Sequence, residues 1–189
     1  MEKKLQQLET NCLRIVLYGP ESTGKTTIAK ALALHYKTEW IPEFARDYLQ
    51  SKWNQRQEVC SLKDLLVIAE GQIGNENKAL LKAKKFLFCD TNVMVTKAWS
   101  ETHFGGYCDP QLKTWVDEFY YDHYFLTYFD VPWEEDDLRD RPKERRSMFN
   151  YFKELLDQND LPYTLLKGNH DNRMKLAIKT LDSIQSKNL

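Results

Sequence analysis

The chain has little glycine and proline, no paired cysteines and no excess of charge of either sign. Among its 189 residues are 7 glycines, 6 prolines and 4 cysteines, and no two cysteines form a C-x-x-C pair. This composition excludes collagen-like, low-complexity and disordered chains. The scattered cysteines predict reduced thiols rather than a disulfide framework or a zinc site. The 27 basic and 28 acidic residues leave a net charge of −1, which disfavours nucleic acid as a partner.

Long hydrophobic runs are absent too. A bilayer span needs about 18 consecutive apolar residues, and the N-terminal MEKKLQQLETN is polar and charged, unlike a signal peptide. We therefore expect a cytoplasmic protein without a membrane partner. What the chain does contain is 42% hydrophobic and 13% aromatic residues, which is enough for the core of one domain over residues 1–189.

Short apolar runs alternate with segments of helical periodicity. Strands are predicted at residues 13–18, 38–41, 86–89, 123–128 and 163–166. Helices are predicted at residues 25–36, 43–53, 61–84 and 171–184. Strands that alternate with helices favour right-handed βαβ units. The predicted fold class is α/β, doubly wound, with a mostly parallel sheet of five strands.

Residues 19–26, GPESTGKT, match the phosphate-binding pattern G-x-x-x-x-G-K-[ST] at every fixed position, between a predicted strand and a predicted helix. Backbone amides and the helix N-terminus of such a loop form a nest for anions. Gly19 and Gly24 frame the loop, Lys25 is expected to reach the β- and γ-phosphates, and the Thr26 hydroxyl to bind Mg²⁺. The expected cofactors are ATP and Mg²⁺.

The rest of the chain indicates which kind of phosphate-loop protein this is. A GTPase should carry an N-K-x-D-like segment, and the nearest string, residues 95–98, lacks the aspartate. Motor ATPases and helicases usually need longer chains. A small-molecule kinase is the better match.

Asp90 ends the apolar run 86–89, and carboxyl ends of parallel strands face the ligand crevice. Asp90 is a candidate to hold Mg²⁺ through water or to accept the proton of a substrate hydroxyl. The alternative is that Asp90 caps a helix beginning at Thr91 or Asn92.

Glu43 and Arg46 follow the second predicted strand and share one face of a helix. They are candidates to hold a ribose or the acceptor hydroxyl, with Glu43 an alternative base, or else they form a surface ion pair. Trp40 and Phe44 flank the end of the same strand, and we expect them near a base or pyridine ring if they are not simply packed in the core.

Residues 136–146, DDLRDRPKERR, form the densest charge run and follow the fourth predicted strand. Small kinases keep a mobile lid at this point, and arginines that close over ATP would neutralise the transferring phosphoryl group. A lid is therefore predicted at about 134–149, with Arg139 and Arg141 foremost and Arg145 next. The alternative is a solvated helical face.

These motifs together resemble the nicotinamide riboside kinase domain of bacterial NadR-type proteins. The resemblance rests on GPESTGKTT at 19–27, EFAR at 43–46, Asp90-Thr91 with Thr96, and Trp133 followed by DDLR at 136–139. It implies substrate contacts around Glu43, Arg46 and Asp90 and lid contacts from Arg139. It also implies ATP-phosphate contacts at Glu21, Ser22, Thr23, Gly24, Lys25, Thr26 and Thr27. No H-x-G-H signature of an adenylyltransferase occurs, so the expected protein is a stand-alone kinase.

Three functions are therefore considered. The first is ATP-dependent phosphorylation of the ribose 5′-hydroxyl of nicotinamide riboside, a small-molecule substrate. The second is a kinase of another nucleoside or of a vitamin alcohol such as thiamine. The third is a non-catalytic ATP-binding module that signals to a partner. The sequence identifies no protein partner.

Overall fold

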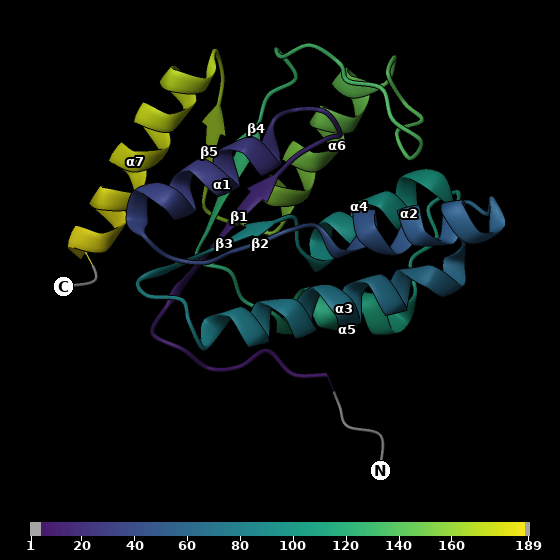
Figure 1. The fold of residues 1–189 in the computed structure, drawn as a ribbon, viewed down its shortest axis with the longest axis horizontal. Coiled ribbons are helices and arrows are strands. Elements are labelled where there is room, and N and C mark those ends of the chain that lie inside the picture. Colours follow the sequence, from purple (N-terminus) through teal and green to yellow (C-terminus); the bar gives the residue numbers. More distant parts are fainter. Residues whose placement is uncertain (1–4, 188–189) are drawn as a thin grey trace.

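The sheet is built around the central strand β1 (Leu13–Tyr18) of the computed structural model, which describes residues 5–187 (Figure 1). The other strands are β2 (Trp40–Ile41), β3 (Phe86–Asp90), β4 (His123–Thr127) and β5 (Tyr163–Leu166). The helices are α1 (Lys25–Tyr36), α2 (Phe44–Arg56), α3 (Leu62–Leu80), α4 (Val93–His103), α5 (Pro110–Glu118), α6 (Arg145–Gln158) and α7 (His170–Lys187). The ends of the predicted domain 1–189 lie outside the described residues.

All five strands run parallel, in the order β2-β3-β1-β4-β5. The chain leaves β1 toward one edge and later returns to place β4 on its other side. This reversal puts a ligand crevice at the carboxyl end of β1. Leu17 in β1 is level with Asp90 in β3, so Asp90 lies beside the point where the chain leaves β1.

Helices cover both faces of the sheet, as the prediction of a doubly wound α/β fold requires, and that prediction is confirmed. Alternate residues of β1 divide between two cores. Ile15 and Leu17 pack on the side of α1 and α7. Val16 and Tyr18 pack on the side of α3, α4, α5 and α6. Helix α2 lies against α3, beyond the sheet (Figure 1).

Some predicted boundaries are wrong. Only residues 40–41 of the predicted strand 38–41 are in β2, and the predicted helix 61–84 ends at Leu80. Helix α6 begins at Arg145, so the last residues of the predicted lid are helical. Helices α4, α5 and α6 were not predicted as such. None of the helices in the described part of the chain has the length and apolar character that a bilayer span requires.

Candidate active site

The loop between β1 and α1 is held in a shape that favours glycine at both ends. Gly19 has a φ of 136°, and a Cβ there would lie 2.8 Å from the Thr127 hydroxyl. Gly24 has a φ of 85° and precedes α1 without a side-chain cap. In contrast, Asn92 caps α4 by accepting a hydrogen bond from the Val95 amide. The first amides of α1 therefore have no side-chain competitor for an anion.

Lys25 and Thr26, the first residues of α1, lie at the centre of the site. The Lys25 amine donates hydrogen bonds to the carbonyl oxygens of Gly19 (3.0 Å) and Pro20 (2.7 Å). The Thr26 hydroxyl donates to one carboxylate oxygen of Asp90. The other Asp90 oxygen is buried without a hydrogen-bond partner among the described residues. Because Asn92 is the helix cap, the alternative role of Asp90 as a cap is wrong.

Three carboxyl groups surround Lys25. Burial raises the pKa of Asp90, and the Lys25 charge and the Thr26 hydroxyl oppose this. Burial likewise raises the pKa of Glu43 against the opposing charge of Lys25. Burial raises the pKa of Glu21 to about 7. A carboxylate with a raised pKa binds a proton more readily, which suits a group that accepts a proton during a reaction.

The donor set suits Mg²⁺ in the way kinases bind it. The described residues contain no group of three or more histidine, cysteine or acidic side chains that could hold a metal ion by themselves. Mg²⁺ normally takes one or two protein oxygens, substrate phosphates and water. The Thr26 hydroxyl and the unpartnered oxygen of Asp90 match that requirement.

Arg46 and Arg139 meet at one carboxylate. The Arg46 guanidinium lies 2.8 Å from Asp136 Oδ2, and Arg139 Nε lies 3.1 Å from the same oxygen. This ion-pair cluster joins α2 to the irregular segment 128–144, which follows β4. Arg46 therefore pairs with a carboxylate of the segment 128–144 rather than with Glu43, which precedes α2.

Arg141 and Arg145 contact backbone carbonyl groups. Arg141 donates to the carbonyl oxygen of Thr102 at the end of α4 (3.1 Å). Arg145 donates to the carbonyl oxygens of Ser22 (2.8 Å) and Val131 (2.9 Å). Residues 128–144 are irregular, so the alternative of a solvated helical face is wrong for this part of the charge run.

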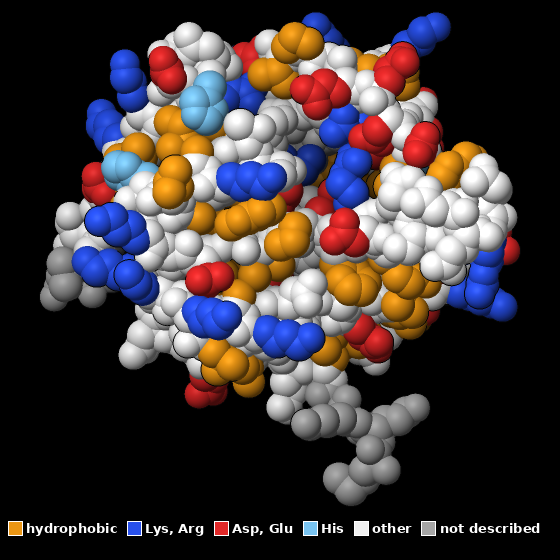
Figure 2. Space-filling view, viewed as in Figure 1, with side chains coloured by type: hydrophobic (Ala, Val, Ile, Leu, Met, Phe, Trp, Pro, Cys, Tyr) orange, Lys and Arg blue, Asp and Glu red, His pale blue; other side chains and the backbone are white. Residues whose placement is uncertain are grey.

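One cavity of about 670 Å³ opens between the phosphate loop, α2, α3, α4 and the segment 128–144. Figure 2 shows this hollow, with basic side chains inside it and acidic side chains around its rim. Most of the predicted site residues line it: Gly19, Glu21, Ser22, Thr23, Gly24, Lys25, Thr26, Thr27, Glu43, Arg46, Arg139, Arg141 and Arg145. Asp90 is not a lining residue and connects to the cavity through Thr26.

Trp40 and Phe44 do not line this cavity. The Lys30 amine lies over the Trp40 ring, 5.1 Å from its centre. Phe44 stacks on Tyr48 and fills the space beside Gly71 of α3, where a Cβ would lie 2.3 Å from its ring. The structure thus places both aromatic residues in packing positions.

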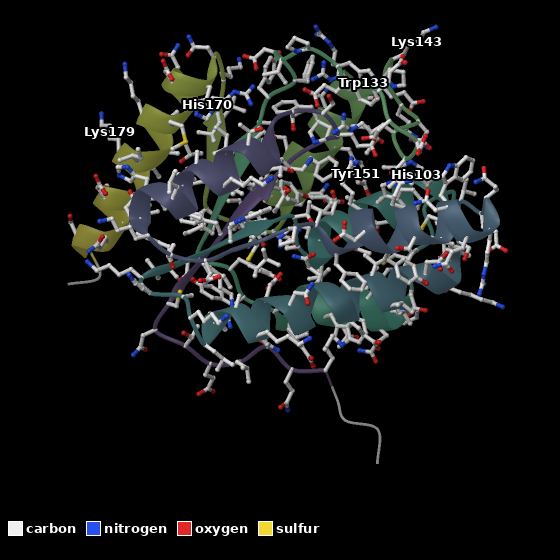
Figure 3. The ribbon with its side chains drawn as sticks, in the orientation of Figure 1. His103, Trp133, Lys143, Tyr151, His170 and Lys179 are labelled. Carbon is white, nitrogen blue, oxygen red and sulfur yellow. The ribbon has the colours of Figure 1, made fainter. Side chains whose placement is uncertain are left out.

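Other aromatic side chains line the cavity that were not among the predicted site residues: Trp53, Trp99, His103, Phe104 and Trp133. Trp99 and His103 stack with ring centres 3.9 Å apart. In Figure 3, His103 lies at the end of α4 and Trp133 lies in the connection after β4. The i, i+4 spacing of Trp99 and His103 soon after Asp90 is a signal that could have identified this pair.

A parallel five-stranded sheet with a phosphate loop after its central strand defines a P-loop protein with the fold of nucleoside and nucleotide kinases. The model of the family described as AAA domain matches residues 14–173, and the chain belongs to that family. The predicted resemblance to NadR-type proteins is confirmed by the relatives that the chain matches.

The curated relatives include the trifunctional NAD biosynthesis/regulator protein NadR of Salmonella typhimurium and of Escherichia coli. Each is 27% identical over 168 residues, which is 87% of this chain and 41% of the relative. The chain therefore spans less than half the length of these relatives.

Solved structures show the same fold. NadR in complex with NR superposes with a TM-score of 0.73 at 17% identity, over 92% of this chain and 50% of that one. Deoxyadenosine kinase from M. mycoides gives a TM-score of 0.66 at 14% identity, over 90% of this chain and 100% of that one. Thymidylate kinase from Ehrlichia chaffeensis gives 0.63 at 18% identity, over 92% and 99%.

Proposed function

We propose that this protein is an ATP-dependent kinase that phosphorylates the ribose 5′-hydroxyl of nicotinamide riboside and yields nicotinamide mononucleotide. The observation that carries the proposal is the Lys25–Thr26–Asp90 arrangement, in which an amine, a hydroxyl and a carboxylate with one unpartnered oxygen meet at the carboxyl ends of β1 and β3. The NadR relatives and the NadR complex with NR support the choice of substrate.

In this proposal, residues 19–27 hold the ATP phosphates and Lys25 leaves its carbonyl partners to reach the β- and γ-phosphates. Thr26 would hold Mg²⁺, which would neutralise charge on the phosphates. Asp90 orients the 5′-hydroxyl and accepts its proton while the oxygen forms its bond to the γ-phosphorus and ADP leaves. Glu43 is the alternative base, and its helix neighbour Arg46 contacts the acceptor.

The cavity also offers a place for a flat, positively charged ring. Trp99 and Trp53 line the cavity, as do the apolar residues Leu65 and Ile68. Aromatic faces attract cations, by about 0.5–2 kcal/mol depending on exposure. In this proposal the pyridinium ring of nicotinamide riboside lies against Trp99 and Trp53. Trp40 and Phe44 pack elsewhere and are not available to it. Such a kinase would use the ATP of the cytoplasm, the compartment that we expect.

The test is an ATP-consumption screen with nicotinamide riboside, canonical nucleosides and thiamine, with products identified by mass spectrometry. Asp90→Asn serves as the control that turnover comes from this site. We expect a product heavier by one phosphoryl group with nicotinamide riboside alone. A product from another nucleoside or from thiamine would assign the alternative kinase. ATP binding without any product would assign the regulatory module.

A further inference from the structure

Arg173 of α7 is a buried arginine that no motif singled out. It is 1% exposed, and the cavity wall includes it. Its guanidinium donates to the carbonyl oxygens of Thr23 (2.6 Å), Gly168 (2.9 Å) and Tyr128 (2.9 Å). It also forms an ion pair with Asp130. One side chain thus connects the phosphate loop, the end of β4 and the loop before α7.

Burying the charge of the Arg173 guanidinium costs free energy, so packing alone does not explain why it is buried here. A buried ion pair is often no more stable than apolar residues of the same size. Burial acts to raise the pKa of Asp130, but the Gly168 amide and the Arg173 guanidinium hold it below its usual range. The pair is therefore charged. The main structural consequence of the Arg173 contacts is that they fix the direction of the Thr23 carbonyl group.

The direction of that carbonyl group decides where the next amide points. A trans peptide is planar, with its C=O and N–H on opposite sides, and the described residues contain no cis peptide bond. Because the Thr23 oxygen points at the Arg173 guanidinium, the Gly24 N–H points away from it. Gly24 has a φ of 85° and no Cβ to oppose this arrangement. Arg145 holds the Ser22 carbonyl in the same manner one residue earlier.

We infer that Arg173 is a positioning residue for nucleotide binding, which turns the Thr23–Gly24 peptide so that its amide serves the phosphate nest. Without this guanidinium the Thr23 oxygen loses its partner, and rotation of the peptide would point a carbonyl oxygen at the phosphates instead of an N–H. The inference rests on the proposed binding of ATP by the loop and is independent of the acceptor that the kinase uses.

The test compares MgADP affinity by calorimetry for wild type, Arg173→Met, Arg173→Lys and Lys179→Met. Lys179 is an exposed residue of the same helix and points away from the body of the protein (Figure 3), which makes it the matched control. We expect Arg173→Met to weaken MgADP at least ~10-fold, because at least one charge-assisted hydrogen bond is lost. Arg173→Lys should recover part of the loss, and Lys179→Met should stay within about twofold.

A second readout separates positioning from support of the fold. In wild type the Gly24 amide proton should move downfield in ¹H–¹⁵N spectra when MgADP binds, and this shift should be lost in Arg173→Met. A variant that melts at lower temperature but binds MgADP within about twofold of wild type would overturn the inference. If Arg173→Met does not fold, Asp130→Asn replaces it as the test variant, because it removes the ion pair that holds the guanidinium but keeps Arg173 itself. Unchanged MgADP affinity in Asp130→Asn would also overturn the inference. Wild type that binds no MgADP would instead contradict the proposed function.

Discussion

The Lys25 side chain makes its hydrogen bonds within the phosphate loop in this structure. Its amine contacts the Gly19 and Pro20 carbonyl oxygens and takes no part in either core. We predict that Lys25→Ala leaves the fold intact and lowers phosphoryl transfer by about 10³-fold or more, because a point charge on the β/γ oxygens is lost. Far-UV circular dichroism and turnover are the measurements, with Lys30→Ala as the control on the same helix. Turnover within about tenfold of wild type would contradict the assignment of the phosphate site.

Asp90 and Glu43 are both candidates for the base, and the structure gives them different surroundings. Asp90 ends β3, is 2% exposed and accepts a hydrogen bond from Thr26. Glu43 instead lies just before α2 and makes no side-chain hydrogen bond to the first turn of that helix. We predict that Asp90→Asn lowers kcat by about 10²–10⁴-fold with little change in ATP affinity. Glu43→Gln should instead raise the KM of the acceptor. The reverse pattern in steady-state kinetics would assign the base to Glu43.

Among the helices and strands, local patterns predicted β1, β3, β4 and β5, because each is a short apolar run next to a turn or a proline, and they placed β2 only in part. They also predicted α1 and α7. Helix α6 was missed because its first turn, with Arg145 and Arg146, lies in the charge run that suggested a lid. Its buried residues Phe149, Phe152 and Leu156 recur at helical spacing, so the signal was present. The short β2 depends on pairing with β3, which no local pattern shows.

His123 makes β4 sensitive to acid. It is 7% exposed, shares a hydrogen bond with Thr164 across to β5, and burial lowers its pKa from 6.5 to about 4. Between these pH values His123 binds a proton in the unfolded chain but not in the folded protein. The folded protein therefore keeps its full stability above pH 6.5 and loses stability as the pH falls toward 4. This group should cost about 2 kcal/mol between pH 7.5 and pH 5.

The measurement is urea unfolding of wild type and His123→Gln at both pH values. The glutamine retains a partner for Thr164 but does not titrate, so the variant should lose about 2 kcal/mol less than wild type over this interval. An equal pH dependence in the two proteins would show that His123 is not the responsible group.

Arg139 and Arg141 lie in the segment 128–144. For this segment to work as a lid, both arginines must leave their present partners and contact ATP. Arg139 pairs with Asp136, and Arg141 holds the Thr102 carbonyl oxygen. If both reach ATP only after the segment closes, Arg139→Ala and Arg141→Ala should lower kcat more than they weaken ATP binding. Rates and ATP affinities within about twofold of wild type would remove these arginines from the site.

Across the whole protein, the sequence predicted the phosphate loop and several charged residues of α2 and of the segment after β4 that line the cavity. It missed Arg173 and the aromatic residues of the cavity wall. The phosphate loop is eight consecutive residues, so spacing alone identifies it. Arg173 reaches Thr23 across 150 positions of the chain, and Trp99 meets Trp53 only as part of one cavity wall. Such contacts depend on the order of strands in the sheet.

Ligands bound in the common cavity should raise the stability of the whole protein. A ligand that binds only the folded state at about 100 times its Kd adds about 2.7 kcal/mol. For a domain of this size that is a rise in Tm of roughly 5–10 °C. We expect MgATP to produce this rise in wild type, and the rise to be largely lost in Lys25→Ala. Nicotinamide riboside should add its own increase, because the cavity wall joins the phosphate loop to α2 and α4. Thermal scans that respond to MgATP but to no acceptor would favour an ATP-binding module, and scans that respond to neither would contradict both ligand assignments.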